Sequence, residues 1–148
     1  APDAITSNAG WATIATREFL TAMCERFRAL GIRDSIFVDP VPEMVRGAKA
    51  CGADRVELYT EAYARDYAAD REAAIAPYVA AAEAARECGL GLNGGHDLSL
   101  ENLRYFIHRI PWCDEVSIGH ALISDALYYG LENTVQMYQR EILNSKHD

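Results

Sequence analysis

The chain has 148 residues, half of them hydrophobic and 24% charged, a composition typical of one folded domain and not of a disordered chain. Its formal charge of −8 disfavours general binding to nucleic acid, because an acidic surface repels the phosphate backbone. No apolar stretch approaches the ~18 residues of a membrane span, and the N-terminal segment APDAITSNAG has neither the basic nor the apolar part of a signal peptide.

The four cysteines predict an intracellular protein without a cysteine-based metal site. Cys24, Cys51, Cys88 and Cys113 form no C-x-x-C pair, so the spacing excludes a zinc knuckle or a thioredoxin-like motif. The first three fall in or at the ends of apolar helical patterns, where a free thiol packs as a small hydrophobic group. We expect buried, reduced thiols and a cytoplasmic location.

A repeated pattern organises the chain: an apolar helix, a glycine, and then a short apolar run. The first helix is predicted by an apolar stripe at steps of three and four, formed by Leu20, Met23, Phe27 and Leu30. Glycines follow three of the helical patterns and are expected to close them in the left-handed conformation; they are Gly31, Gly52 and Gly89. Strands are expected at residues 36–39, 55–59, 90–94 and 115–119.

The later helices follow from composition and periodicity. Residues 71–88 are rich in Ala and Glu, although Pro77 predicts a kink or a restart. An apolar stripe predicts a helix over residues 100–110, and residues 121–143 form a last helical stretch that is broken or bent near Gly130.

The alternation of strands and helices predicts a single α/β domain over residues 1–148, with four βα units and a parallel sheet. A closed (β/α)8 TIM barrel needs about 250 residues, so four units make half of one. The chain is therefore either a small open α/β domain or the C-terminal half of a barrel. As a half-barrel it would leave two sheet edges unpaired and one sheet face uncovered.

Candidate functional residues gather at the ends of the predicted strands, where parallel α/β folds collect their chemistry. His96 follows a pair of glycines that bring the backbone close to a ligand and give the imidazole room, and histidine exchanges protons near neutral pH. The alternative is a loop histidine hydrogen-bonded to a carbonyl. Glu57 is expected to point away from the side of Val56 and Leu58, into the barrel, as a proton-transfer group or a partner for a cationic intermediate. The alternative there is an ion pair with an arginine.

Gly119 and His120 precede the last helical stretch and form a candidate anion site from backbone N–H groups and a helix N-terminus. Lysine occurs only at Lys49 and Lys146, away from the strand ends, which excludes a Schiff-base lysine aldolase. A weaker alternative treats Glu57, His96, His120 and Asp39 as the metal ligands of a sugar-phosphate isomerase or epimerase.

Three ordered motifs, GADRVELYTEAYA, GLGLNGGHDLSLENL and DEVSIGHALISDAL, closely resemble the C-terminal half of the pyridoxine 5′-phosphate synthase family. The upstream segments ITSNAGW and GIRDSIFVDP are similar to that family's segment after strand four and its fifth strand. The resemblance implies an eight-stranded β/α barrel that assembles into homo-oligomers. It also implies condensation of 3-amino-2-oxopropyl phosphate with 1-deoxy-D-xylulose 5-phosphate into pyridoxine 5′-phosphate, phosphate and water, without a metal or an organic cofactor.

The resemblance also implies roles for single residues. His96 matches the family's proton-donating histidine, and Glu57 matches its strand-six glutamate, which stabilises the transition state. Four residues match substrate-binding positions: Thr6, Asp97, Gly119 and His120. Asp97 stands at a backbone-binding position that some members fill with glycine.

The sequence contains no counterpart of the family's N-terminal half, which supplies strands one to four and a further catalytic histidine and glutamate. Asp34, at the edge of the first predicted strand, is also unusual, because β-sheets disfavour aspartate. Two main hypotheses follow: part of a synthase that acts on phosphorylated small molecules, or a catalytically incomplete half-barrel that folds or self-associates without activity.

Overall fold

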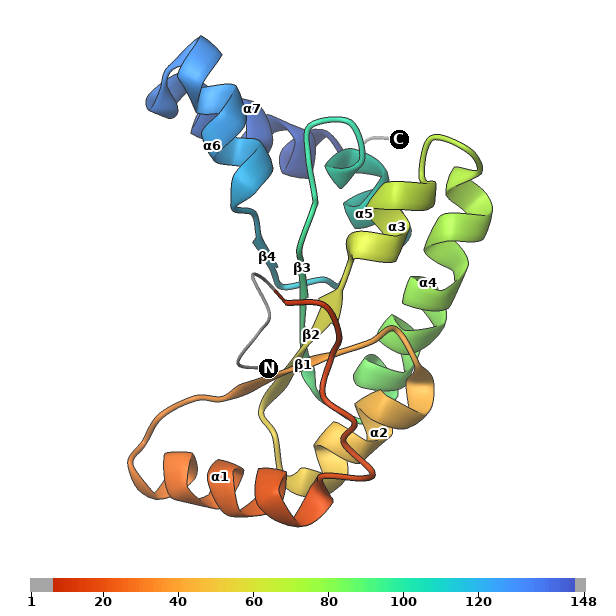
Figure 1. Ribbon diagram of the computed structural model, residues 1–148, viewed down its shortest axis with the longest axis vertical. Helices are drawn as coiled ribbons and strands as arrows, with labels where there is room; N and C mark the ends of the chain where they lie inside the picture. The colour runs from red at the N-terminus through yellow and green to blue at the C-terminus, as the bar shows by residue number, and fades with distance from the viewer. Residues whose placement is uncertain (1–6, 146–148) are drawn as a thin grey trace.

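The computed structural model describes residues 7–145, which form a parallel sheet with helices between its strands (Figure 1). The four strands lie side by side in chain order as β1 (Ser35–Val38), β2 (Arg55–Tyr59), β3 (Gly91–Gly95) and β4 (Glu115–Ser117). Each neighbouring pair is parallel. The helices are α1 (Arg17–Ala29), α2 (Pro42–Cys51), α3 (Glu61–Asp66), α4 (Arg71–Glu87), α5 (Leu103–Arg109), α6 (His120–Tyr129) and α7 (Leu131–Asn144). The predicted α/β class and the parallel sheet are confirmed.

Element boundaries differ from the sequence predictions in a few places. The second strand is as predicted, the first and third are shifted by one residue, and the fourth ends at Ser117, opposite the last residue of β3. Of the two outcomes predicted at Pro77, a kink or a restart, the restart does not occur, because α4 runs through this proline as one helix whose alanine-rich face is buried. The short helix α3 was not predicted. The break near Gly130 is confirmed, since this residue separates α6 from α7.

Local chemistry explains several ends of these elements. The three predicted closing glycines, Gly31, Gly52 and Gly89, all have positive φ, so they follow their helices in the left-handed region as expected. Asp34 lies just before β1 and not within it. Its backbone N–H donates to Asp54 Oδ2 at 3.1 Å, while the Asp54 N–H donates to Asp34 Oδ1 at 3.0 Å. The two aspartates therefore hold the starts of β1 and β2 together.

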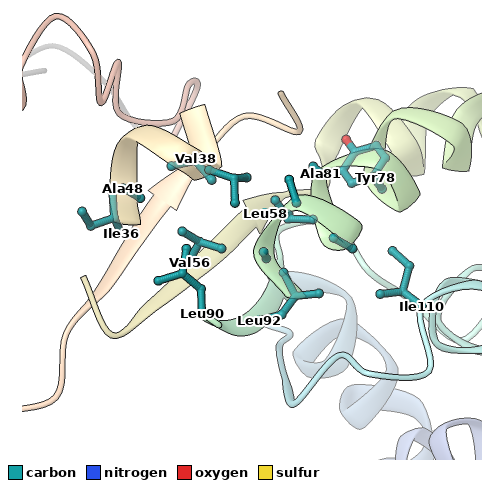
Figure 2. Packing of buried hydrophobic residues seen from close by; sticks show 14 of the residues in the cluster. Ile36, Val38, Ala48, Val56, Leu58, Tyr78, Ala81, Leu90, Leu92 and Ile110 are labelled. Atoms are coloured by element: carbon teal, nitrogen blue, oxygen red, sulfur yellow. The ribbon is translucent and has the colours of Figure 1, made fainter. Parts of the chain in front are cut away.

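The hydrophobic core lies between the sheet and the helices α2, α4 and α5 (Figure 2). On β2 every second residue faces this core: Val56 and Leu58 are fully buried, while Arg55, Glu57 and Tyr59 alternate with them and are partly exposed. Because strand side chains alternate between faces, burial of one set fixes the other set on the opposite face. The prediction that Glu57 points away from Val56 and Leu58 is confirmed.

The opposite face of the sheet carries no helix within residues 7–145; Figure 1 places α2, α3, α4 and α5 together on the other side. The outer edge of β1 is partly covered, because the backbone N–H of Trp11 donates to the carbonyl of Phe37 at 2.7 Å.

Large hydrophobic side chains are exposed at both ends of the chain, including Phe19 on α1 and Leu127 (82%) and Tyr128 (85%) on α6. In the described part of the chain, every helix is too short or too polar to cross a membrane.

All four cysteines are free, but only Cys24 and Cys51 are buried as predicted; Cys88 and Cys113 are partly exposed. Cys88 is partly exposed because it is the residue that caps the C-terminus of α4. Burial raises the pKa of the Cys24 thiol to about 11, and the negative charge of Asp34 adds to the effect. A thiol with such a pKa is a poor nucleophile at neutral pH.

We therefore expect Cys24 to react with a thiol reagent far more slowly than Cys88 in the folded protein at pH 7.5. Mass spectrometry of peptides after timed labelling measures both rates in one sample. Labelling in denaturant is the control and should remove the difference. Equal rates in the folded protein would contradict the structural burial of Cys24.

Candidate active site

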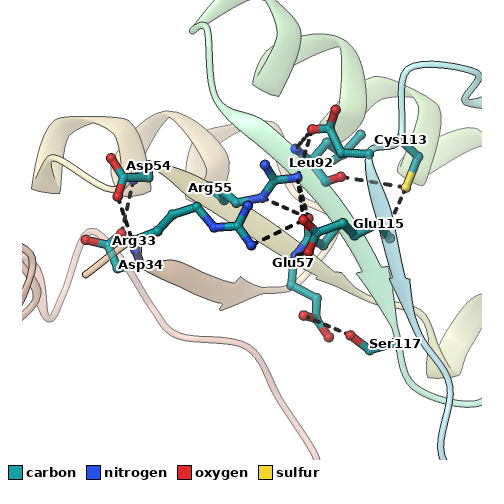
Figure 3. Close-up of polar contacts among 11 residues, drawn as sticks. Arg33, Asp34, Asp54, Arg55, Glu57, Leu92, Cys113, Glu115 and Ser117 are labelled. Atoms are coloured by element: carbon teal, nitrogen blue, oxygen red, sulfur yellow. Dashed lines mark hydrogen bonds and ion pairs between the residues drawn. The ribbon is translucent and has the colours of Figure 1, made fainter. Parts of the chain in front are cut away.

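Two side chains of β2 reach across β3 to β4 on the open face of the sheet, and both pass over a glycine (Figure 3). Glu57 accepts a hydrogen bond of 3.4 Å from the Ser117 hydroxyl, and a Cβ added to Gly95 would lie 2.2 Å from Glu57 Oε1. Arg55 crosses at the other end of β3, where a Cβ on Gly91 would lie 2.6 Å from its Nη1. The glycines of β3 therefore leave space for the two long side chains of β2.

Arg55 takes part in a network that holds three strands together. Its guanidinium donates to Asn93 Oδ1 at 2.8 and 3.0 Å and forms an ion pair of 2.9 Å with Asp114. Glu57 belongs to none of the ion pairs found among residues 7–145. Among these residues, the Glu57 carboxylate accepts a hydrogen bond from the Ser117 hydroxyl.

The surroundings of Glu57 make its carboxyl a weaker acid. Partial burial raises the pKa of Glu57 above its ordinary value of 4.5, the Ser117 hydroxyl acts against this rise, and the negative charge of Glu115 adds to it. The folded protein therefore binds this proton more tightly than the unfolded chain does. A raised carboxyl pKa suits a group that exchanges a proton.

We expect Glu57→Gln to increase the free energy of unfolding at pH 7, because ionised Glu57 opposes folding whenever the pH exceeds its folded-state pKa. The gain should shrink as the pH falls through the raised pKa, and it should vanish below about 4.5, where both states of the wild type are protonated. Urea unfolding of both proteins at pH 7 and pH 4 measures the difference. A glutamine variant that is less stable at pH 7 would overturn this sign.

His96 follows β3 in an unusual backbone turn. His96 and Asp97 have φ values of 89° and 59°, and they are the non-glycine residues with positive φ in the described part of the chain. Such a conformation costs on the order of 1–2 kcal/mol per residue, so the surrounding structure must hold it. Asp97 thus occupies a backbone conformation that glycine adopts freely.

Three successive carbonyls of this turn accept hydrogen bonds from two buried polar residues. Thr60 donates its backbone N–H to the Gly95 carbonyl at 2.9 Å and its hydroxyl to the His96 carbonyl. Asn102 donates its side-chain amide to the Asp97 carbonyl at 3.3 Å. Thr60 is fully buried and Asn102 is 5% exposed, so these bonds form away from bulk water. They hold the turn that positions His96.

The imidazole of His96 lies between an aromatic ring and a carboxylate. Its Nδ1 is 3.0 Å from Asp97 Oδ2, and its ring meets the Tyr59 ring edge-on at 4.9 Å between centroids. Tyr59 packs in turn on Phe37, and its hydroxyl donates to the Ser7 carbonyl at 3.2 Å. On this side the imidazole Nδ1 faces a carboxylate.

A pocket of about 330 Å³ joins His96 to the predicted anion site, and its lining consists of His96, Asp97, Ser117, Ile118, Gly119 and His120. Gly119 is the N-cap of α6 and His120 is its first residue. No side chain caps this end of α6, and its first turn holds no acidic residue. The uncapped N–H groups of a helix start, together with the helix dipole, favour a negatively charged ligand.

The structure thus brings together five of the six predicted site residues. Glu57 contacts Ser117, which lines the same pocket as His96, Asp97, Gly119 and His120. Thr6 lies outside the described residues. Asp39 lies after β1, where its carboxylate accepts from the Gly10 N–H at 3.0 Å. Within residues 7–145 no three His, Cys, Asp or Glu side chains gather closely enough to hold a metal ion.

Sequence reasoning missed the supporting residues and misread the glycine pair. Added Cβ atoms on Gly94 and Gly95 would meet the Phe106 ring at 2.8 Å and Glu57 Oε1, so the pair makes room for these side chains and not for the imidazole. One feature of the sequence could have indicated a supporting role for Thr60 and Asn102, since each is a polar residue next to an apolar element. Their partners lie 36 and 5 residues away, and the more distant one depends on the pairing of β2 with β3.

The arrangement of parallel strands, intervening helices and polar side chains at the carboxyl ends of β2, β3 and β4 defines the β/α class of enzyme folds. The family described as pyridoxal phosphate biosynthesis protein PdxJ matches residues 1–144. The chain belongs to this family.

Curated relatives carry the name pyridoxine 5′-phosphate synthase. The protein of Cytophaga hutchinsonii is 61% identical over 142 residues, which cover 96% of this chain and 60% of the relative. The protein of Bacteroides thetaiotaomicron is 62% identical over 138 residues, which cover 93% of this chain and 58% of the relative. The protein of Porphyromonas gingivalis is 53% identical over 142 residues, which cover 96% of this chain and 60% of the relative. The chain therefore spans about three fifths of the length of these relatives.

Proposed function

We propose that this chain provides the C-terminal half of a TIM-barrel pyridoxine 5′-phosphate synthase, with residues 1–148 forming four of the eight β/α units. The reaction condenses 3-amino-2-oxopropyl phosphate with 1-deoxy-D-xylulose 5-phosphate and releases phosphate and water. The observation that supports this most directly is the gathering of Glu57, His96 and the Gly119–His120 helix start around adjacent strand ends.

The proposed chemistry divides between two side chains. The amine of one substrate forms an imine with the ketone of the other, and His96 moves a proton during dehydration and ring closure. Glu57 stabilises the cationic imine, and its partial burial strengthens that interaction because water screens it less. Both side chains need a fixed position, which the Ser117 hydroxyl and the turn of residues 95–97 support.

The proposed phosphate site is the start of α6. Backbone N–H groups of a helix start point at an anion, and Gly119 leaves open space where a side chain would otherwise stand. His120 and Asp97 line the same pocket, and Thr6 is proposed as a further substrate contact. The proposed synthase needs no metal or organic cofactor and acts as a homo-oligomer in the cytoplasm.

Product formation tests this proposal. Both phosphorylated substrates are incubated with the purified 148-residue chain, and with a fusion of this chain behind the remaining two fifths of the Cytophaga hutchinsonii relative. We expect pyridoxine 5′-phosphate from the fusion, above the level given by the same fusion carrying His96→Ala. A folded fusion that forms no product would overturn the proposal. Product from the chain alone would mean that two copies rebuild a working site.

The exposed sheet face favours a second candidate, a half-barrel that self-associates without activity. Within residues 7–145, β4 has a strand partner on one side only, and exposed apolar side chains such as Phe19 and Leu127 remain at the two ends. Light scattering after gel filtration gives the mass of the isolated chain. A dimer without product supports this candidate, and a stable monomer argues against it.

A further inference from the structure

We propose that Tyr63 is a positioning residue for the loop of residues 96–102, which joins β3 to α5 and begins with His96. Tyr63 lies on the short helix α3 and is fully buried. Its hydroxyl donates to the Asn102 carbonyl at 2.7 Å. The kinetic part of this inference rests on the proposed function, whereas the part that concerns the rigidity of the loop does not.

Asn102 carries the effect of Tyr63 into the loop. Its side-chain oxygen accepts from the Ser99 N–H at 2.9 Å, and its side-chain amide donates to the Asp97 carbonyl at 3.3 Å. Asn102 is thus held at its own carbonyl by Tyr63 while its side chain reaches back to residues 97 and 99. These bonds fix the loop from its last residue to the residue that follows His96.

Tyr78 on α4 fixes Tyr63 against the end of β2. The Tyr63 N–H donates to the Tyr78 hydroxyl at 3.1 Å, and that hydroxyl donates to the Tyr59 carbonyl at 2.9 Å. Because β2 also carries Glu57, the series of hydrogen bonds runs from the strand of Glu57 to the loop of His96. It links the two elements whose side chains the proposed mechanism needs at a fixed separation.

The hydroxyl of Tyr63 is not needed for packing. Its ring packs against the rings of Tyr78 and Phe106, at 5.7 and 5.4 Å between centroids, and phenylalanine would make the same contacts. A buried hydroxyl without a partner costs free energy, so the bond to Asn102 is what allows a tyrosine here. Burial raises the pKa of the Tyr63 hydroxyl, which therefore keeps its proton at neutral pH and acts as a donor.

Tyr63→Phe tests this role because it removes the hydroxyl and keeps the ring. The Asn102 carbonyl retains a partner in this variant, since it also accepts from the Phe106 N–H at 3.1 Å. The matched control is Ile75→Val, which removes one buried methyl group from α4 and destabilises the fold to a similar degree without removing a polar group. A second variant, Asn102→Ala, removes both side-chain bonds of Asn102 to the loop. Circular dichroism verifies the folding of all three variants.

The first measurement is amide hydrogen exchange in the 148-residue chain, followed by NMR. The Ser99 N–H reports on the loop, which opens locally, and the Leu58 N–H reports on global unfolding, because β2 pairs with a strand on each side. Ser99 should exchange about 10-fold faster in Tyr63→Phe, the factor that corresponds to one lost hydrogen bond. It should exchange at least as fast in Asn102→Ala.

The control separates a loosened loop from a less stable fold. Ile75→Val should accelerate exchange at Leu58 and leave the Ser99 rate as in the wild type, because local opening of a loop does not depend on global stability. An unchanged Ser99 rate in Tyr63→Phe would overturn the inference, whether or not the protein turns over substrate. An unchanged rate in Asn102→Ala would overturn it as well.

The second measurement is steady-state kinetics in the fusion that tests the proposed function. Tyr63→Phe should lower kcat by about 10-fold, less than the loss expected for a displacement of a full 1 Å, with KM changed by less than about threefold. Ile75→Val should match the wild type. A rise in KM at constant kcat, or an unchanged kcat, would refute the positioning role.

A double variant tests whether Tyr63 acts through Asn102. Tyr63→Phe should have little further effect on kcat in a protein that already carries Asn102→Ala, whereas effects that multiply would contradict the series of hydrogen bonds. If no form of the fusion turns over, the proposed function fails and hydrogen exchange alone decides the role of Tyr63.

Discussion

Replacing His96 with asparagine is expected to lower the turnover of pyridoxine 5′-phosphate formation by about 10²- to 10⁴-fold, the usual contribution of a positioned proton-transfer group. Asparagine suits the experiment because it tolerates positive φ, and His96 has a φ of 89°. The variant should therefore keep the turn and the fold while it loses the ionisable ring. Steady-state kinetics in the active fusion measures the effect.

Phosphate binding separates a chemical role of His96 from a structural one. The proposed phosphate site at Gly119 and His120 belongs to α6 and does not depend on the imidazole, so His96→Asn should still bind inorganic phosphate, as measured by calorimetry. The matched control is His108→Asn, on α5, whose histidine faces the Ser145 carbonyl at 3.2 Å and lies outside this pocket. Normal turnover by His96→Asn would remove His96 from the proposed mechanism.

Substituting alanine for Gly95 is expected to lower turnover by about 10²-fold, the loss typical of a displacement of roughly 1 Å at a reacting group. The new Cβ would lie 2.2 Å from Glu57 Oε1 and 3.1 Å from Ser117 Cβ. The end of a glutamate side chain can swing away, so the carboxylate would leave Ser117 while the backbone stays in place. The free energy of unfolding should therefore change by less than about 1 kcal/mol.

Gly91→Ala is the matched control, since it adds the same methyl group to the same face of β3, four residues earlier. There the new Cβ would lie 2.6 Å from Arg55 Nη1 and would break the bonds of Arg55 to Asn93 and Asp114. We expect the free energy of unfolding of Gly91→Ala to fall by about 1–3 kcal/mol, the usual contribution of hydrogen bonds to charged groups. Its turnover should stay unchanged. A stable, fully active Gly95→Ala variant would contradict the idea that Gly95 leaves the space in which the Glu57 carboxylate is held.

A double variant tests whether Gly95 acts through Glu57. If the methyl group matters only because it displaces the carboxylate, Gly95→Ala should have little further effect on turnover in a protein that already carries Glu57→Gln. Independent effects that multiply would mean that Gly95 acts on another part of the site.

The residues that form the site were predictable from sequence because strand ends are marked locally. Glu57 alternates with two apolar neighbours, and His96 and Gly119–His120 follow short apolar runs, so the pattern alone placed them at one edge of a parallel sheet. At Pro77 local helix chemistry left a kink and a restart both open, and only the packed structure shows one continuous helix, whose alanine-rich face is buried.

The sequence by itself determined the order of strands and helices, the glycines that end three helices, and the face of β2 on which Glu57 lies. These features depend on periodicity and on conformational preferences within a few residues. Only the tertiary structure decided that Glu57 meets Ser117 over Gly95, and that Thr60 holds the carbonyl of His96. The reason is physical. Glu57 and Ser117 are separated by 60 positions in the chain, and Thr60 and His96 by 36. The register of neighbouring strands decides whether such distant residues meet, and no local pattern contains that register.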